Sequence, residues 1–141
     1  MKINEIVRFN GQLGTIVDDY DNKDIFKFLP VNYGRNFSKD LETITEETIE
    51  PASFEDKLLY LKKGFNWGKI IKIQAIGDYQ IIEYISCSSG KGEPSFHSYV
   101  DFKDTNHSYN TLEQALIGVI AHRFDGVNSR AAGYFCKMIG I

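Results

Sequence analysis

Hydrophobic and polar positions alternate in short runs near the start of the chain. Two such runs, Ile6–Phe9 and Leu13–Val17, flank Asn10-Gly11, a dipeptide that favours the positive φ angles of a two-residue hairpin turn. Residues 25–29 alternate in the same way and end before Pro30. The pattern therefore predicts a β-hairpin followed by a third strand.

The periodicity weakens between residues 31 and 51, which predicts a long irregular or partly helical segment. Ser53 and Asp56 then have the spacing of a capping box, in which each side chain accepts a hydrogen bond from the other's backbone N–H. Apolar residues recur at helical spacing after Ser53, so we expect a helix from 54 to 63.

A second hairpin is expected where residues 69–75 and 79–86 flank the turn dipeptide Gly77-Asp78. A Gly- and Ser-rich loop follows at 88–94, and residues 95–102 return as another strand.

Helical periodicity returns near the C-terminus. Thr111 or Asn110 caps a first helix that ends at Asp125-Gly126, and Asn128 or Ser129 caps a second helix over 130–139. The expected fold class is α+β: an antiparallel β-rich N-terminal part with a middle helix, followed by two short C-terminal helices. At 141 residues the chain fits one domain, so we expect a single ligand-binding domain over 1–141.

Composition adds an expected location. The sequence is 43% hydrophobic and 25% charged, which is ordinary for a globular protein, and it has neither a secretory h-region nor a membrane-length apolar run. Cys87 and Cys136 are too few and too far apart for a disulfide framework, so we expect two buried thiols in a reducing cytoplasm.

The net charge of −3 is unevenly distributed. Residues 40–56 contain seven carboxylates and no Lys or Arg, and the rest of the chain has 12 acidic and 16 basic residues. The acidic segment is interpreted either as a solvated loop or as a docking patch for a protein partner. The basic remainder suits an anionic ligand, while a pI of about 5.6 disfavours a nucleic-acid polymer.

The sequence contains none of the GxSxG, HExxH, Walker A or dinucleotide-binding patterns, so we expect no enzyme and no cofactor. His97, His107 and His122 lack the helical spacing of a zinc site, and we expect structural or surface roles for them rather than metal ligation.

Two of the four arginines, Arg123 and Arg130, lie around the junction of the expected C-terminal helices. The free N–H groups of a helix that begins near Ser129 favour an anion, and Arg123 could add bidentate hydrogen bonds to a phosphate. Arg123 could equally complement the negative C-terminus of its own helix.

Aromatic and amide side chains precede these helices. Phe96 could stack on a purine and Asn106 could hydrogen-bond a base, although Phe96 also suits a strand core and Asn106 a turn.

The spacing of Phe96, Asn106 and Arg123, followed by a helix that ends in Cys136-Lys-Met-Ile-Gly, resembles the first type of phage Thoeris anti-defence sponges. This resemblance implies a pocket lined by the aromatic residue, the asparagine and the arginine. It also implies a cyclic ADP-ribose isomer as the sequestered ligand, made by the TIR-domain enzymes of bacterial immunity. Cyclic dinucleotides are a second class of nucleotide ligand that stays open.

The resemblance further implies a basic residue from the central strands on the phosphates. Lys72 is the nearest candidate, and Arg8 or Arg35 are alternatives from the N-terminal half. It also implies a homodimer or higher homo-oligomer in the cytoplasm of the infected host.

Two other functions remain open. The chain could be a protein-interaction inhibitor of a host defence enzyme that docks through residues 40–56. It could also hydrolyse a nucleotide signal with His97 or His107 as the general base.

Overall fold

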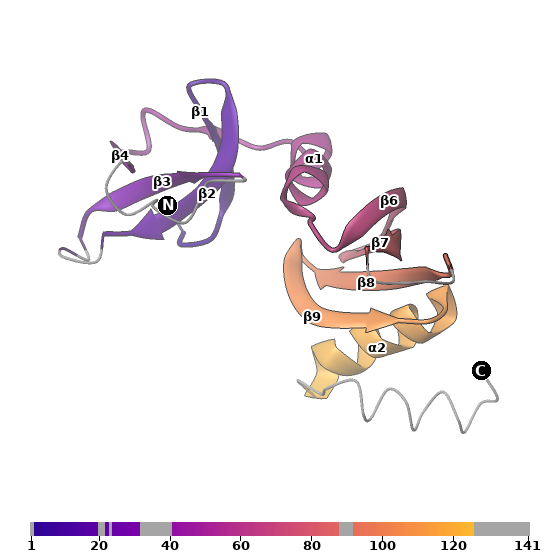
Figure 1. Ribbon diagram of the computed structural model, residues 1–141. Helices are drawn as coiled ribbons and strands as arrows, with labels where there is room; N and C mark the ends of the chain where they lie inside the picture. The colour runs from indigo at the N-terminus through magenta and orange to yellow at the C-terminus, as the bar shows by residue number, and fades with distance from the viewer. Residues whose placement is uncertain (1, 20–21, 23, 32–40, 88–91, 126–141) are drawn as a thin grey trace. The chain divides into compact units, whose positions relative to one another are not determined.

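The computed structural model of the chain describes residues 2–19, 22, 24–31, 41–87 and 92–125, with side chains described up to residue 120 (Figure 1). The chain divides into two compact units, Met1–Gly64 and Phe65–Ile141. The expectation that residues 1–141 act as a single domain stays a prediction.

The first unit contains a five-stranded antiparallel sheet. Its strands are β1 (Ile6–Phe9), β2 (Gln12–Asp18), β3 (Phe26–Pro30), β4 (Glu42–Ile44) and β5 (Glu50–Pro51), in the spatial order β4-β3-β2-β1-β5. The predicted hairpin and third strand are confirmed, and Asn10 and Gly11 have φ angles of 50° and 78° in the two-residue turn. Strands β4 and β5 correct the expectation of an irregular or partly helical segment before Pro51, because both pair at the sheet edges.

A buried cluster in this sheet contains one side chain from each of four strands, namely Val7, Ile16, Phe28 and Ile44. Helix α1 (Phe54–Gly64) follows β5 and confirms the helix expected from 54 to 63. The capping box is formed: Asp56 N–H donates to Ser53 Oγ, and Ser53 N–H donates to Asp56 Oδ2, both at 3.1 Å.

The second unit contains a four-stranded antiparallel sheet in sequential order. Its strands are β6 (Gly68–Ile76), β7 (Tyr79–Ser86), β8 (Pro94–Val100) and β9 (Lys103–Tyr109). The hairpin expected around Gly77-Asp78 is confirmed by β6 and β7. Cys87, which follows β7, is exposed, so the expectation that it is a buried thiol is wrong, and Cys136 lies outside the described residues.

Strand β9 was not expected from the sequence. The segment Lys103–Tyr109 is polar and has no apolar alternation, but it pairs along β8 from Phe96 to Val100. The connecting turn has positive φ at both Asp101 (50°) and Phe102 (62°), a conformation usually taken by Gly or Asn. The strand expected at 95–102 therefore ends at Val100 and becomes one arm of a tight hairpin.

Helix α2 (Leu112–Asp125) packs against β7, β8 and β9 (Figure 1). It confirms the first of the two expected C-terminal helices, and Thr111 Oγ1 caps it by accepting the N–H of Gln114 at 3.1 Å. Ala115 and Val119 on this helix are completely buried. The second expected helix, 130–139, lies outside the described residues.

The expected fold class needs correction. In the described part of the chain, two antiparallel sheets built from nine strands accompany two helices, so the protein is mostly β. The physical reason is that short polar strands such as β4, β5 and β9 form by pairing with neighbours, which leaves a weak hydrophobic pattern in the sequence.

Candidate functional site

A β-bulge in β9 is the most irregular feature of the second sheet. His97 pairs with Ser108 and Tyr99 pairs with Asp104, so three residues of β9 lie opposite one residue of β8. At the centre of this bulge Asn106 has a φ angle of 62°, a left-handed conformation that Gly adopts freely and Asn more often than most other residues. Bulges of this kind re-aim side chains and are frequent next to binding sites.

Two side chains hold the bulge. Asp104 Oδ1 accepts the backbone N–H of Asn106 at 2.7 Å, and Thr105 Oγ1 accepts the N–H of His107 at 3.3 Å. Thr105 Oγ1 also donates to the carbonyl of Ser98 at 3.0 Å, which ties the bulge to β8. The backbone groups that the bulge removes from the ladder are thus satisfied by local side chains.

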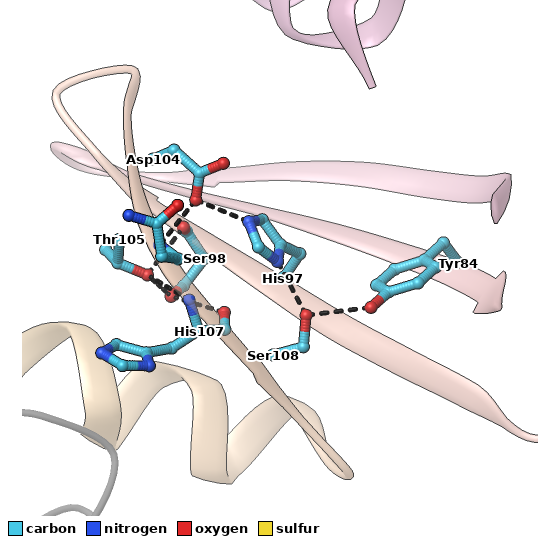
Figure 2. A network of polar contacts seen from close by, with 8 residues as sticks. Tyr84, His97, Ser98, Asp104, Thr105, His107 and Ser108 are labelled. Carbon is cyan, nitrogen blue, oxygen red and sulfur yellow. Dashed lines mark hydrogen bonds and ion pairs between the residues drawn. The ribbon is translucent and has the colours of Figure 1, made fainter. Parts of the chain in front are cut away.

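The bulge is linked to a buried histidine. His97 Nε2 lies 2.6 Å from Asp104 Oδ1, and His97 Nδ1 lies 2.7 Å from Ser108 Oγ (Figure 2). Tyr84 OH lies 2.9 Å from the same Ser108 Oγ. Because a carboxylate only accepts hydrogen bonds, Nε2 carries a hydrogen and donates it to Asp104.

Aromatic rings enclose His97, whose exposed fraction is 1%. Trp67 stacks on it with centroids 5.4 Å apart, and Tyr99 meets it edge-on at 5.3 Å. Burial raises the pKa of the Tyr99 phenol, and the nearby Asp104 carboxylate and Tyr84 raise that pKa further. Tyr99 therefore stays protonated at pH values where an ordinary tyrosine ionises.

Asp104, His97 and Ser108 are the residue types of a hydrolytic triad. An acyl-transfer site also requires N–H donors directed at the developing oxyanion. The N–H groups of Asn106 and His107, which precede Ser108, already donate to Asp104 and Thr105. These two N–H groups therefore hold the bulge in place.

The structure brings two of the expected ligand-binding residues onto one face of the sheet. Lys72 pairs with Glu83, Glu83 with Phe96, and Phe96 with Tyr109, so all four form a single row across the strands. Directly opposite residues project from the same face, and Lys72 and Phe96 are two strand spacings, roughly 10 Å, apart. Lys72 is exposed and Phe96 is half-buried.

Helix α2 covers this same face. A Cβ atom added to Gly118 would overlap the hydroxyl end of the Tyr109 side chain, so the two residues are packed together. The backbone of Arg123 belongs to the last turn of α2, while its side chain and the whole of Arg130 lie outside the described residues. Asn106 is exposed on the β9 bulge.

Arg8 and Arg35 were the alternatives to Lys72 as the basic residue on the phosphates. Arg8 is bound to Asp56 within the first unit, and Arg35 lies outside the described residues.

The sequence did not indicate Tyr84 or Asp104 as parts of a site, and it indicated Ser108 and Tyr109 only as members of the aromatic and amide segment 106–110. Tyr84, Asp104 and Ser108 have no shared motif spacing, because strand pairing brings them together around His97. Tyr109 instead pairs with Phe96 in the neighbouring row. The positive φ at Asn106 had one sequence signal, since asparagine is among the residues that adopt this conformation most readily.

Within the described ranges, no group of three or more His, Cys, Asp or Glu side chains is arranged to hold a metal ion. Neither helix in that part of the chain combines the length and apolar character needed to cross a bilayer. No protein-family model, curated protein or solved structure matches the chain.

Proposed function

We propose that the chain is a phage anti-defence sponge that binds a cyclic ADP-ribose isomer and sequesters it without cleavage, which blocks TIR-based bacterial immunity. The proposal rests on the resemblance of Phe96, Asn106 and Arg123 to the first type of Thoeris anti-defence proteins. The structural observation that supports it is the row in which Phe96 and the cation Lys72 share the sheet face covered by α2.

Each residue has a separate role in the proposed pocket. Phe96 stacks on the adenine, and the amide of Asn106 hydrogen-bonds the base or a ribose. Arg123 and Lys72 neutralise the diphosphate, with Arg130 and the N-terminus of the following helix as additional donors. The two strand spacings between Lys72 and Phe96 are on the length scale of one nucleotide, roughly 10 Å.

Sequestration fits the chemistry of the site better than catalysis does. A sponge requires tight binding of the ground state, whereas an enzyme must bind the transition state preferentially. The N–H groups of Asn106 and His107 are already hydrogen-bonded to Asp104 and Thr105, so these two groups are not free to bind an oxyanion beside Ser108. The sponge acts in the cytoplasm of the infected host as a homodimer or higher homo-oligomer.

Binding followed by chemical analysis of the ligand tests the proposal. The purified chain is titrated with each cyclic ADP-ribose isomer and with cyclic dinucleotides by calorimetry, and the complex is then heated and the released molecule identified. We expect one cyclic ADP-ribose isomer to bind and to be recovered intact. Recovery of a linear product would favour the hydrolase, and absence of binding to every isomer would remove the sponge.

Variants locate the pocket. Phe96→Leu keeps an apolar side chain but removes the stacking face, and we expect a loss of affinity of about fivefold or more, because base stacking contributes roughly 1–3 kcal/mol. Arg123→Ala should weaken binding, with Lys63→Gln on α1 as the control for loss of one positive charge. Unchanged affinity in both pocket variants would show that the ligand binds elsewhere.

The acidic segment supports a second candidate, a protein-interaction inhibitor. Glu42, Glu46, Glu47 and Glu50 are all exposed around β4 and β5, where they can meet a basic partner. Under this alternative, the combined change of Glu46, Glu47 and Glu50 to Gln abolishes the anti-defence effect in infected cells while Arg123→Ala preserves it. The sponge predicts the opposite result for both variants.

A further inference from the structure

The positive φ angle of Asn106 is held in place by neighbouring side chains. A φ angle of 62° costs a residue with a side chain some conformational free energy, and such strain persists where surrounding groups over-determine it. The group that meets Asn106 is the carboxylate of Asp104, whose Oδ1 accepts the Asn106 N–H at 2.7 Å. This two-residue loop from side chain to backbone is an Asx-turn, and it stabilises the bulge locally.

An exposed Asx-turn alone would be a weak restraint, because an aspartate side chain rotates freely in water. Asp104 is fixed from the other side by His97, which approaches the same Oδ1 through Nε2 at 2.6 Å. His97 in turn is 1% exposed and lies between the rings of Trp67 and Tyr99. The rotamer of Asp104 is therefore set by a residue that cannot move without disturbing the sheet's aromatic packing.

The hydrogens along this chain can all point in one direction. Tyr84 O–H donates to Ser108 Oγ, Ser108 O–H donates to His97 Nδ1, and His97 Nε2–H donates to Asp104 Oδ1 (Figure 2). Every link then has one donor and one acceptor, so no buried polar hydrogen is left without a partner. The chain begins at Tyr84 in the buried part of β7 and ends at the exposed bulge.

We propose that Asp104 is a positioning residue that holds Asn106 for ligand binding, and that the Tyr84–Ser108–His97 chain keeps Asp104 oriented. The proposal deepens the proposed function and rests on it, because it assigns the preorganisation of one ligand-binding residue. Preorganisation matters here since a side chain that is already placed loses less conformational entropy when the nucleotide binds. The same network thus has a role in affinity without touching the ligand.

A double-mutant cycle tests this coupling. Asp104→Ala, Asn106→Gly and the double variant are titrated with the cyclic ADP-ribose isomer that the wild type binds. A glycine adopts positive φ without strain but has no amide side chain, so Asn106→Gly removes the group that Asp104 is proposed to position. We expect Asp104→Ala to weaken binding by about tenfold in the wild-type background and to have no further effect in the Asn106→Gly background.

The conservative variant Asp104→Asn provides the rescue, since its side-chain oxygen can still accept the N–H of Asn106. It should retain most of the affinity that Asp104→Ala loses. Equal losses from Asp104→Ala in both backgrounds would overturn the proposal, because a general loss of stability weakens binding regardless of the residue at position 106.

A measurement on the ligand-free protein separates this proposal from the proposed function. By NMR, the Asn106 amide should show slow hydrogen exchange in the wild type, faster exchange in Ser108→Ala, and the fastest in Asp104→Ala. An Asn106 amide that exchanges at the same rate in Asp104→Ala and the wild type would overturn the positioning role whether or not ligand binds. A wild type with a protected amide but no affinity for any isomer would instead remove the sponge function.

Discussion

Arg8 donates two hydrogen bonds to the carboxylate of Asp56, from Nε to Oδ2 at 3.1 Å and from Nη2 to Oδ1 at 2.6 Å. Asp56 Oδ2 also accepts the N–H of Ser53, so one carboxylate completes the capping box of α1 and joins the helix to β1. The hydrogen bonds from Arg8, followed by the backbone hydrogen bond from Ser53, lower the pKa of Asp56 from 3.8 to about 2.

This pKa gives the first prediction, which concerns acid stability. Because the folded-state pKa lies below the unfolded value of 3.8, the stabilisation by Asp56 is complete above that value and is lost as the pH falls towards about 2. Asp56→Asn should therefore be less stable than the wild type near neutral pH, and the difference should shrink in acid. Urea unfolding of both proteins between neutral pH and about pH 2 measures this difference in the free energy of unfolding.

Glu55→Gln is the control for that experiment, since it removes a neighbouring carboxylate from the same first turn of α1. The difference in unfolding free energy between Glu55→Gln and the wild type should change less in acid than the difference for Asp56→Asn. A gap between Asp56→Asn and the wild type that stays constant down to about pH 2 would contradict the role given to the Arg8 pair.

The second prediction concerns the contact between α2 and the sheet. Gly→Ala in a helix ordinarily stabilises by up to about 1 kcal/mol. At Gly118 the added methyl group would collide with the ring of Tyr109, so Gly118→Ala should destabilise the second unit by roughly 1–3 kcal/mol, as overpacking does. Thermal unfolding shows directly whether Gly118→Ala lowers or raises the stability of the protein.

Gly64→Ala is the matched control, because its nearest neighbour is Val31 Cγ2 at 3.6 Å, an ordinary contact. It should be neutral or slightly stabilising. If Gly118→Ala were as stable as Gly64→Ala, Tyr109 would not be packed against α2.

The third prediction concerns the charges in the row of Lys72 and Phe96. Glu83 lies between them in the row, so its carboxylate opposes the binding of a diphosphate that Lys72 attracts. Lys72→Gln should weaken ligand binding and Glu83→Gln should strengthen it, each by up to about fivefold, because one charge interaction at the surface contributes roughly 0.2–1 kcal/mol.

Calorimetry at low and high salt checks both variants, since screening should reduce the two effects together. Changes of affinity in the same direction for Lys72→Gln and Glu83→Gln would be incompatible with an anionic group bound over this row.

The fourth prediction concerns alkaline stability. The pKa of Tyr99 is raised above its usual value of 10.0, first by burial and then by Asp104 and Tyr84. The folded state therefore holds this proton more tightly than the unfolded state, and the resulting stability is complete below pH 10.0 and is lost as the pH rises above it. Tyr99→Phe cannot ionise, so its stability should fall less between about pH 8 and about pH 11.

Denaturant unfolding at both pH values compares the two proteins. Tyr79→Phe serves as the control, because Tyr79 belongs to the same sheet but is less buried. Equal alkaline losses in the wild type and Tyr99→Phe would mean that Tyr99 ionises at the same pH in both states.

The local elements were predictable where a few adjacent residues decide the backbone. Asn10-Gly11 and Gly77-Asp78 specify two-residue turns, and Ser53 with Asp56 specifies the start of α1. These signals depend on steric and hydrogen-bonding preferences within four residues, so they can be read without knowledge of tertiary contacts.

The β8–β9 hairpin was not predictable by the same reasoning. Its turn at Asp101 and Phe102 has no glycine, and it is held by Gln80, a buried residue of β7 whose Oε1 accepts the Phe102 N–H at 2.8 Å. A turn supported by a side chain 22 positions away leaves no local signal. The polar strand β9 exists because β8 offers it a ladder of hydrogen bonds.

The sequence by itself determined the β1–β2 and β6–β7 hairpins and the helices α1 and α2. It also supplied Phe96, Asn106 and Lys72 as candidate ligand residues. Only the tertiary structure decided that Lys72 and Phe96 share one row and that Asp104 connects His97 to Asn106. The physical reason is strand register, since a shift of one residue turns every side chain of a strand to the opposite face. Register depends on pairing partners and bulges that are distant in sequence. The candidate site is therefore assembled by tertiary contacts.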